Sequence, residues 1–200
     1  MSTIFGSATA QAQHLAHSLI NAEQAALLVI DVQEKLAPAM ADSAQLTARI
    51  QWLVGACQVL ATPTLFTEQY PKGLGHTLPA LLAVAEQAPV VEKSHFSVAA
   101  AQCLPASWAQ HSQIIVIGME THVCVLQTVL ELLQAGKEVF VVADAVGSRT
   151  EQNRELGLAR MRHAGAQIVT REMVVFELLR HAGHEKFKTI SQEFLRGEQP

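Results

Sequence analysis

The stretch Gln113-Ile-Ile-Val-Ile-Gly-Met-Glu-Thr-His-Val-Cys-Val-Leu-Gln-Thr128 decides the fold. Its run of β-branched apolar residues, Ile114 to Ile117, predicts a short strand buried on both faces. We expect Gly118 to end this strand and Thr121 to cap a helix that Gly136 terminates. The apolar positions of that helix recur at helical spacing: Val125, Leu126, Val129, Leu130 and Leu133.

Cys124 falls in the first turn of this predicted helix. Unpaired backbone N–H groups and the helix dipole favour negative charge there, so the thiol is expected to ionise more readily than a free one. The same N–H groups could hold a developing oxyanion. The alternative is that Cys124 only fills space, as buried cysteines commonly do. His122 cannot be its partner, because residues two apart on a helix do not face each other.

Length and composition indicate one compact domain, which we take as residues 1–200. Apolar residues make up 50% of the chain and charged residues 16%, a globular rather than a disordered composition. The net charge is −4, without a basic block or a long acidic run, so nothing indicates binding to nucleic acid or to a membrane surface. No apolar run approaches the roughly 18 residues of a membrane span.

The cysteines Cys57, Cys103 and Cys124 are too few, and odd in number, for a disulfide framework. They favour a reducing compartment. The N-terminal residues also lack the basic start and the continuous apolar stretch of a secretory signal. We therefore expect a cytoplasmic protein.

Short apolar strands alternate with helices along the chain. The expected strands are residues 25–31, 63–66, 89–93, 114–117, 138–144 and 167–170. The expected helices are residues 8–21, 43–61, 79–86, 121–136, 151–163, 174–179 and 186–195. This alternation predicts an α/β fold: a three-layer, doubly wound, Rossmann-like sheet of about six parallel strands with helices on both faces.

Polar groups follow several of these strands, at the edge where such sheets bind ligands: Asp31, Glu68, Lys93 and the turn of Cys124. Asp144 is expected to end a fifth strand, in a context typical of a turn. Lys93 would favour the thiolate of Cys124 by its charge. Asp31 would carry the thiol proton while Cys124 attacks an electrophilic carbonyl to form a thioester. Each group could instead be a solvated strand end or a helix cap.

Three segments carry a resemblance to a known family: Leu28-Val-Ile-Asp-Val-Gln33, Glu92-Lys-Ser-His-Phe-Ser97 and Gly118-Met-Glu-Thr-His-Val-Cys-Val125. At these residues the chain resembles the isochorismatase-like cysteine hydrolases, α/β hydrolases that include nicotinamidases and N-carbamoylsarcosine amidases. The resemblance extends over about residues 24 to 195. It implies a hydrolase, a small-molecule substrate and a homo-oligomer.

The catalytic triad of that family falls on Asp31, Lys93 and Cys124. The resemblance also implies a non-proline cis peptide before the nucleophile turn, at Met119–Glu120. Together with the amides of Glu120 and Cys124, this bond would form the oxyanion hole.

One departure from the family concerns metal binding. Nicotinamidases carry an Asp-x-His metal motif after the second strand, where this chain has Glu68-Gln-Tyr-Pro-Lys-Gly-Leu-Gly75, with His76 next. That stretch resembles the metal-independent isochorismatase-domain subgroup, so we expect neither a metal nor another cofactor. A nicotinamidase activity is disfavoured, and the presence of Cys124 favours acyl-type hydrolysis over vinyl-ether cleavage.

The sequence therefore predicts a cysteine hydrolase for a small amide or a related C–N or ester substrate. We assign Gln33, Tyr70 and Phe96 to the pocket wall, with ordinary packing as the alternative for each. Two other functions stay open. The first is a catalytically silent binding protein on the same fold. The second is a redox-responsive thiol protein, with Cys57 or Cys103 approaching Cys124 in space.

Overall fold

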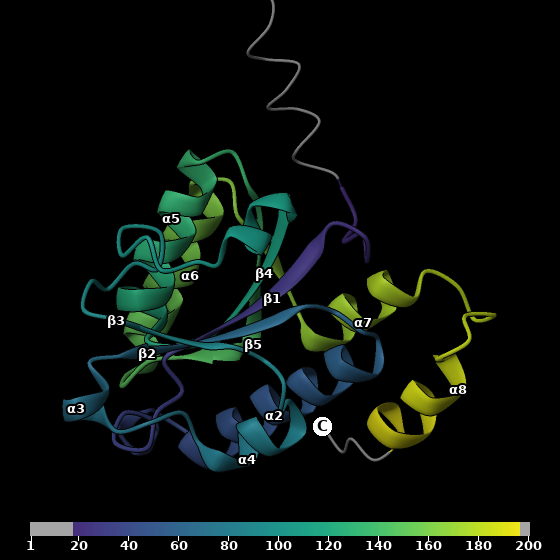
Figure 1. The fold of residues 1–200 in the computed structure, drawn as a ribbon, viewed down its shortest axis with the longest axis horizontal. Coiled ribbons are helices and arrows are strands. Elements are labelled where there is room, and N and C mark those ends of the chain that lie inside the picture. Colours follow the sequence, from purple (N-terminus) through teal and green to yellow (C-terminus); the bar gives the residue numbers. More distant parts are fainter. Residues whose placement is uncertain (1–17, 197–200) are drawn as a thin grey trace, which may run out of the picture.

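The computed structural model describes residues 18–196. Its centre is a six-stranded sheet in the order β3-β2-β1-β4-β5-β6, and each neighbouring pair is parallel (Figure 1). The predicted doubly wound α/β fold is confirmed. The strands are β1 (Ala25–Ile30), β2 (Thr64–Gln69), β3 (Val90–Lys93), β4 (Gln113–Met119), β5 (Glu138–Gly147) and β6 (Gln167–Val169).

Helices cover both faces of the sheet (Figure 1). One face carries α2 (Ser43–Val59), α4 (Pro79–Val84), α7 (Arg171–Leu179) and α8 (Phe187–Ile190). The opposite face carries α5 (Leu126–Gln134) and α6 (Glu151–His163). Shorter helical turns are η1 (Ala37–Ala39), α3 (Pro71–Leu74), η2 (Ala106–Gln110), η3 (Thr121–Val125) and η4 (Ser191–Leu195).

The central strands are apolar without interruption because both of their faces are buried. Successive side chains of a strand point to opposite faces, and β1 divides accordingly between two cores. Leu27 and Val29 pack under α2, whereas Leu28 and Ile30 pack under α5 and α6. No polar side chain therefore interrupts β1 before Asp31, the first residue beyond it.

The strand order places Asp31 and the turn after β4 next to each other. The chain moves outward from β1 through β2 to β3, and then returns to add β4 on the other side of β1. The order of the strands reverses between β1 and β4, which is where open α/β sheets leave a crevice for ligands. Ile30, the last residue of β1, pairs with Gly118 near the end of β4.

We predicted from the sequence that Gly118 ends the fourth strand, but the structure shows that it does not. Strand β4 continues through Gly118 to Met119. Gly118 has a φ of 116°, and a Cβ built there would lie 2.1 Å from the carbonyl oxygen of Ile30. A glycine is needed here because it lets β4 keep this φ while passing against β1.

Thr121 does not cap the following helix either. The cap position is Glu120, without a side-chain hydrogen bond, and Thr121 is the first residue of the π-helical turn η3. The Thr121 hydroxyl is buried and has no hydrogen-bond partner within residues 18–196. The predicted cap was wrong because η3 begins at Thr121 itself, one residue earlier than a helix capped by Thr121 would begin.

The fifth strand is longer than we predicted, because β5 runs to Gly147 rather than ending at Asp144. The β4–β5 register shifts after Val116 and resumes further along β5, where Met119 pairs with Gly147. Asp144 therefore lies within the strand. Its carboxylate accepts hydrogen bonds from the backbone N of Arg171 at 3.0 Å and from the Arg171 Nε at 2.8 Å.

The helix predicted for residues 8–21 falls mostly outside the described residues. Residues 18–21 are not helical. The boundaries of the other helices differ from the predicted ones by a few residues, except for α6, whose bounds agree.

Candidate active site

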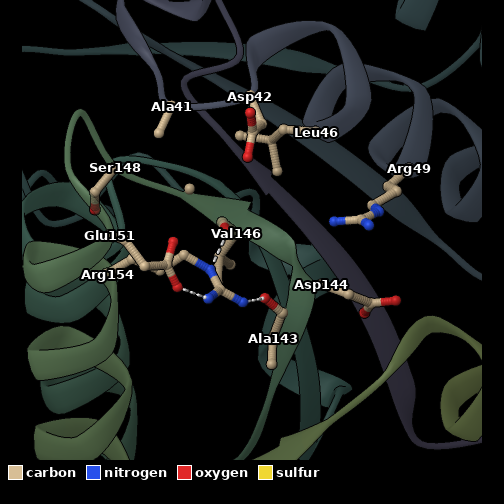
Figure 2. Close-up of a pocket in the computed structure, with 11 residues that line it drawn as sticks. Ala41, Asp42, Leu46, Arg49, Ala143, Asp144, Val146, Ser148, Glu151 and Arg154 are labelled. Atoms are coloured by element: carbon tan, nitrogen blue, oxygen red, sulfur yellow. Dashed lines mark hydrogen bonds and ion pairs between the residues drawn. The ribbon is translucent and has the colours of Figure 1, made fainter.

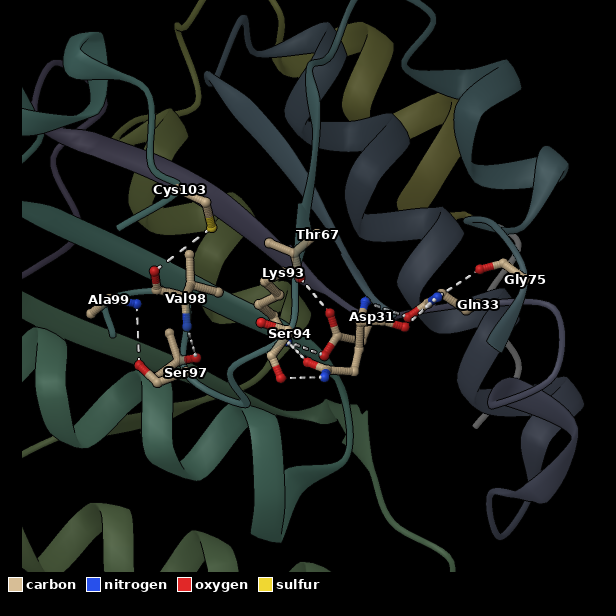
Figure 3. A network of polar contacts seen from close by, with 12 residues as sticks. Asp31, Gln33, Thr67, Gly75, Lys93, Ser94, Ser97, Val98, Ala99 and Cys103 are labelled. Carbon is tan, nitrogen blue, oxygen red and sulfur yellow. Dashed lines mark hydrogen bonds and ion pairs between the residues drawn. The ribbon is translucent and has the colours of Figure 1, made fainter. Parts of the chain in front are cut away.

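Asp31 and Lys93 form a buried ion pair at the carboxyl edge of the sheet (Figure 3). The Lys93 Nζ lies 2.7 Å from the Asp31 Oδ2, and neither side chain is exposed to solvent. The hydroxyl of Thr67 donates a hydrogen bond of 2.6 Å to the other carboxylate oxygen, Oδ1. Both oxygens of Asp31 are thus held by fixed donors, so its orientation is determined.

Lys93 is held in turn by Gln69, the last residue of β2. The Lys93 Nζ donates to the Gln69 Oε1 at 2.8 Å, and the Gln69 Nε2 donates to the carbonyl of Ser94 at 2.8 Å. The acceptor oxygen of Gln69 must face Lys93 in this arrangement, because its nitrogen is already occupied by a carbonyl.

The side chain of Gln33, labelled in Figure 3, forms hydrogen bonds with the backbone of Gln69. Its Oε1 accepts a hydrogen bond of 2.8 Å from the Gln69 backbone N. Its Nε2 donates to the Gln69 carbonyl at 3.1 Å and to the Gly75 carbonyl at 2.6 Å. Both N–H groups of the Gln33 side-chain amide are therefore already used, and neither is available to a substrate. Gln33 instead supports the backbone of Gln69.

Two hydrogen bonds connect the segment after β3 to α5, the helix that follows η3. The Ser97 hydroxyl donates to Glu131 at 2.6 Å, and the backbone N of Val98 donates to the Thr128 hydroxyl at 3.1 Å. These bonds link the strand end that carries Lys93 to the helix that continues from η3.

Cys124 lies in η3, directly after β4, and is only 5% exposed. The negative charge of Asp31 and the positive charge of Lys93 both act on the pKa of its thiol. Asp31 is therefore paired with Lys93 and acts on the pKa of Cys124, which lies in the turn after β4 at the switch point of the sheet. Gly157 of α6 packs against this turn, since a Cβ there would lie 3.1 Å from the Thr121 carbonyl oxygen.

The electrostatics of the thiol differ from our prediction. Burial raises the pKa of Cys124, and the negative charge of Asp31 raises it further, while the charge of Lys93 only partly opposes them. The pKa of the thiol is therefore raised, whereas we predicted that this thiol ionises more readily than a free one. Desolvation outweighs the helix terminus here because Cys124 is enclosed. Burial also raises the pKa of Asp31, although Lys93 and Thr67 oppose the shift.

The peptide bond between Met119 and Glu120 is cis, at the position to which the resemblance assigned it. Glu120 follows this bond and forms an ion pair with Arg149, with 2.8 Å between the Arg149 Nε and the Glu120 Oε2. Met119 is fully buried in the core beneath α2.

Glu68 lies beside Thr67 on β2 but takes no part in this network. Its carboxylate accepts hydrogen bonds from the Thr77 backbone N at 2.6 Å and from the Thr77 hydroxyl at 2.9 Å, and the His76 Nδ1 lies 3.0 Å away. Burial alone would raise the pKa of Glu68, but these bonds outweigh it and the pKa is lowered. In the described part of the chain, no three or more His, Cys, Asp or Glu side chains are grouped to hold a metal ion.

Tyr70 and Phe96, the other residues assigned to the pocket wall, are both exposed. Tyr70 follows β2 and its backbone N donates to the Lys93 carbonyl at 3.0 Å. Phe96 lies in the segment after β3. Both are thus close in sequence to residues that hold the ion pair.

A separate cavity of about 240 Å³ lies at the end of β5, between α2 and α6 (Figure 2). Its walls carry both signs of charge, including Asp42 and Arg49 from the α2 side and Glu151 and Arg154 from α6. None of the residues of the Asp31 network lines it. The Arg154 Nε donates a hydrogen bond of 3.1 Å to the carbonyl oxygen of Val146. The cavity is therefore separate from the Asp31 network.

Comparison with known proteins indicates the family to which this chain belongs. The isochorismatase domain matches residues 25–173. Isochorismatase family protein 1B of Dictyostelium discoideum is 38% identical over 174 residues, which cover 84% of this chain and 84% of that protein. The chain belongs to the isochorismatase family. The family fold and a hydrolase class follow from this membership.

Solved structures place the chain among other members of the family. The MAR1 ribonuclease of Caenorhabditis elegans superposes with a TM-score of 0.85 at 37% identity, covering 92% of this chain and 95% of that one. The YcaC gene product of Escherichia coli, described as an octameric hydrolase of unknown specificity, superposes with a TM-score of 0.81 at 25% identity. That match covers 90% of this chain and 92% of YcaC.

Two residues of the network were not predicted from the sequence, Thr67 and Gln69. A signal was present, because polar side chains in a strand that is buried throughout need partners, and β2 is buried at every position. The partners themselves depend on strand order: Thr67 meets Asp31 only because β2 lies next to β1, in the register that pairs Ile30 with Thr67.

No helix among residues 18–196 is long and apolar enough to cross a membrane.

Proposed function

We propose that this chain is a cysteine hydrolase that cleaves a small amide, or a related C–N or ester bond, through a thioester intermediate. The observation that carries the proposal is the buried ion pair of Asp31 and Lys93, whose charges both act on the pKa of the Cys124 thiol in η3. A protonated thiol beside a carboxylate of raised pKa is suited to lose its proton at the moment of attack. The charge of Lys93 then keeps Asp31 available as the acceptor.

In the acylation step, the Cys124 sulfur forms a bond to the substrate carbonyl carbon while Asp31 takes the thiol proton. The carbonyl oxygen becomes an oxyanion, for which we propose the backbone amides of Glu120 and Cys124 as donors. The C–N bond then breaks, and the protonated Asp31 gives its proton to the departing nitrogen. The product amine leaves and the acyl group stays on Cys124 as a thioester.

In the deacylation step, Asp31 takes a proton from a water molecule as the water oxygen attacks the thioester carbon. The C–S bond breaks, the acid product leaves, and the proton returns from Asp31 to the Cys124 sulfur. Each cycle thus consumes one water molecule and restores the resting state.

We propose a small molecule rather than RNA as the substrate, although the relative from C. elegans carries ribonuclease in its name. A protein that binds RNA neutralises phosphates with lysine and arginine side chains. This chain has a net charge of −4 and no basic block.

Tyr70 and Phe96 are proposed for the wall of the substrate pocket, and Gln33 is proposed to support that wall.

We further propose that the chain forms a homo-oligomer of single hydrolase domains in the cytoplasm. The E. coli YcaC protein is described as an octamer, and this supports self-association of the present chain. The cytoplasmic location is supported by three cysteines that are all free in the structure.

The test is a screen of small amides and esters with purified protein, together with an RNA oligonucleotide as a separate substrate. Turnover of a panel compound should disappear in Cys124→Ala and persist in Cys103→Ala, a matched loss of one thiol. Intact-mass spectrometry on a slow substrate should show the acyl group on the peptide that contains Cys124. Cleavage of RNA that depends on Cys124 would overturn the small-molecule substrate. A protein that turns over nothing but binds panel compounds would be the silent binding protein instead.

A further inference from the structure

The ammonium of Lys93 is enclosed by the protein and needs acceptors for its N–H groups. Its side chain has no exposed surface, and an ammonium carries donors only. Within residues 18–196 the structure gives it two acceptors, the Asp31 Oδ2 at 2.7 Å and the Gln69 Oε1 at 2.8 Å. A buried charge without such partners is strongly disfavoured. Gln69 and Asp31 therefore hold Lys93 together.

The side-chain amide of Gln69 is fixed in one orientation. Its Nε2 donates a hydrogen bond of 2.8 Å to the Ser94 carbonyl oxygen, so its oxygen is the atom left to face Lys93. Its backbone is held as well, because the buried Gln33 amide accepts from the Gln69 N at 2.8 Å and donates to the Gln69 carbonyl at 3.1 Å. A flipped amide would set an N–H donor against the ammonium and an oxygen against the Ser94 carbonyl.

Gln69 accepts a hydrogen bond from Lys93 without adding a charge. Asp31 and Glu120 both raise the pKa of the Cys124 thiol by their negative charge, while the positive charge of Lys93 lowers it. These groups come from the ends of three strands that meet at one edge of the sheet. A further carboxylate beside Lys93 would offset its charge, whereas a neutral amide leaves that charge available to Asp31 and to the thiol.

We propose that Gln69 is a positioning residue for the reaction, because it holds the Lys93 ammonium against Asp31 through an uncharged acceptor in one fixed orientation. Gln69 acts through Lys93 and not by contact with the substrate. Its part in turnover rests on the hydrolase function proposed above. Its effect on the charge of Lys93 can be measured on the Cys124 thiol without any substrate.

The variant Gln69→Glu tests the uncharged acceptor, because glutamate has the shape of glutamine. A protonated glutamate can donate its hydroxyl to the Ser94 carbonyl and accept from Lys93, as the amide does. An ionised glutamate adds a negative charge and sets an oxygen against that carbonyl. Burial and the neighbouring Asp31 favour the neutral form, so the pKa of the new carboxyl should be raised and the variant should change behaviour as the pH rises.

The measurement is the rate at which iodoacetamide labels Cys124 in the full-length chain, followed by peptide mass spectrometry over a range of pH. Wild type and Gln69→Glu should label at equal rates near about pH 5, and the variant should be about threefold slower or more by about pH 8. A ratio of the two rates that stays constant with pH would overturn the inference.

The matched control is Gln113→Glu, at the first position of β4 and so at the opposite edge of the sheet. Gln113 is also buried, and its Nε2 donates to the Glu138 Oε2 at 2.7 Å, so this variant likewise sets a new carboxylate beside an existing one. It reproduces the general loss of stability, but its Cys124 should label as fast as the wild type at every pH. Equal slowing in both variants would mean that destabilisation, and not the charge at Lys93, is the cause, and would overturn the inference.

A second variant, Gln69→Met, removes the acceptor and keeps a side chain of similar length. With a panel compound that the wild type turns over, kcat per mole of folded protein should fall about tenfold or more while KM stays within about twofold. An unchanged kcat, or a raised KM alone, would overturn the inference, since the latter would make Gln69 a substrate contact. If the wild type turns over no compound, the hydrolase proposal fails, and the labelling rates still decide whether Gln69 preserves the charge of Lys93.

Discussion

Replacing Lys93 by methionine leaves the carboxylate of Asp31 buried without its counter-charge. The Lys93 Nζ and the Asp31 Oδ2 are 2.7 Å apart, and both side chains are fully buried. Removing one partner of such a pair costs about 3–5 kcal/mol of unfolding free energy. In a chain of this length each kcal/mol shifts Tm by about 2–4 °C, so Lys93→Met should melt roughly 6–20 °C below the wild type.

The control is the double variant Asp31→Asn with Lys93→Met, which removes both charges. Replacing a whole buried pair by neutral groups of similar size is often nearly neutral, so the double variant should recover most of the lost stability. The Thr67 hydroxyl, which donates to the Asp31 Oδ1, can still donate to the asparagine oxygen. The Gln69 Oε1 loses its lysine donor in both variants, so this loss cancels in the comparison.

The pH dependence gives a second check on the same pair. Burial raises the pKa of Asp31 while the charge of Lys93 opposes it, so in Lys93→Met the pKa should rise further above its unfolded value. A folded state with the higher pKa loses stability as pH rises through that pKa and regains it as pH falls. Urea unfolding should therefore show the gap between variant and wild type narrowing on acidification.

Two results would refute this reasoning about the ion pair. The first is a loss in Lys93→Met below about 1 kcal/mol, the value of an exposed pair. The second is a double variant no more stable than the single one, which would mean that the uncompensated charge is not the cause.

Further predictions concern the thiol, the strand contact and metal independence. In Asp31→Asn, which removes the negative charge that raises the pKa of Cys124, iodoacetamide should label Cys124 at pH 7 about tenfold faster or more, while turnover is lost. Peptide mass spectrometry measures the label, and an unchanged rate would contradict the assigned cause. Gly118→Ala should cost about 1–3 kcal/mol more than Gly165→Ala, because both glycines have positive φ but only at Gly118 would the added Cβ lie 2.1 Å from a backbone oxygen. Equal losses in chemical denaturation would show that the strands can move apart there. Turnover should survive EDTA, because residues 18–196 gather no group of three or more metal-ligating side chains. A loss restored by zinc or iron would show the opposite.

Local patterns were sufficient for most of the fold. The apolar runs of β1 and β4 are readable because both faces of a central strand are buried. The bounds of α6 were predicted correctly, since Thr150 caps it by accepting a hydrogen bond from the Asn153 backbone N. Predictions failed where a neighbouring strand decides the geometry. From the local sequence alone, Gly118 predicts the end of a strand. In the structure the strand continues through Gly118, because β1 lies beside it and pairs with it.

The sequence by itself determined the alternation of strands and helices and the positions of the three side chains proposed for catalysis. It could do so because hydrophobic periodicity is local, and because Lys93 ends a strand, Asp31 follows one and Cys124 lies in the turn after a third. Only the tertiary structure decided which partners they meet. Strand order brings Thr67 to Asp31, and Gln69 to Lys93, across gaps in the chain. It also decided the state of the Cys124 thiol, because desolvation is the sum of everything packed around a group and no single segment of sequence contains that sum.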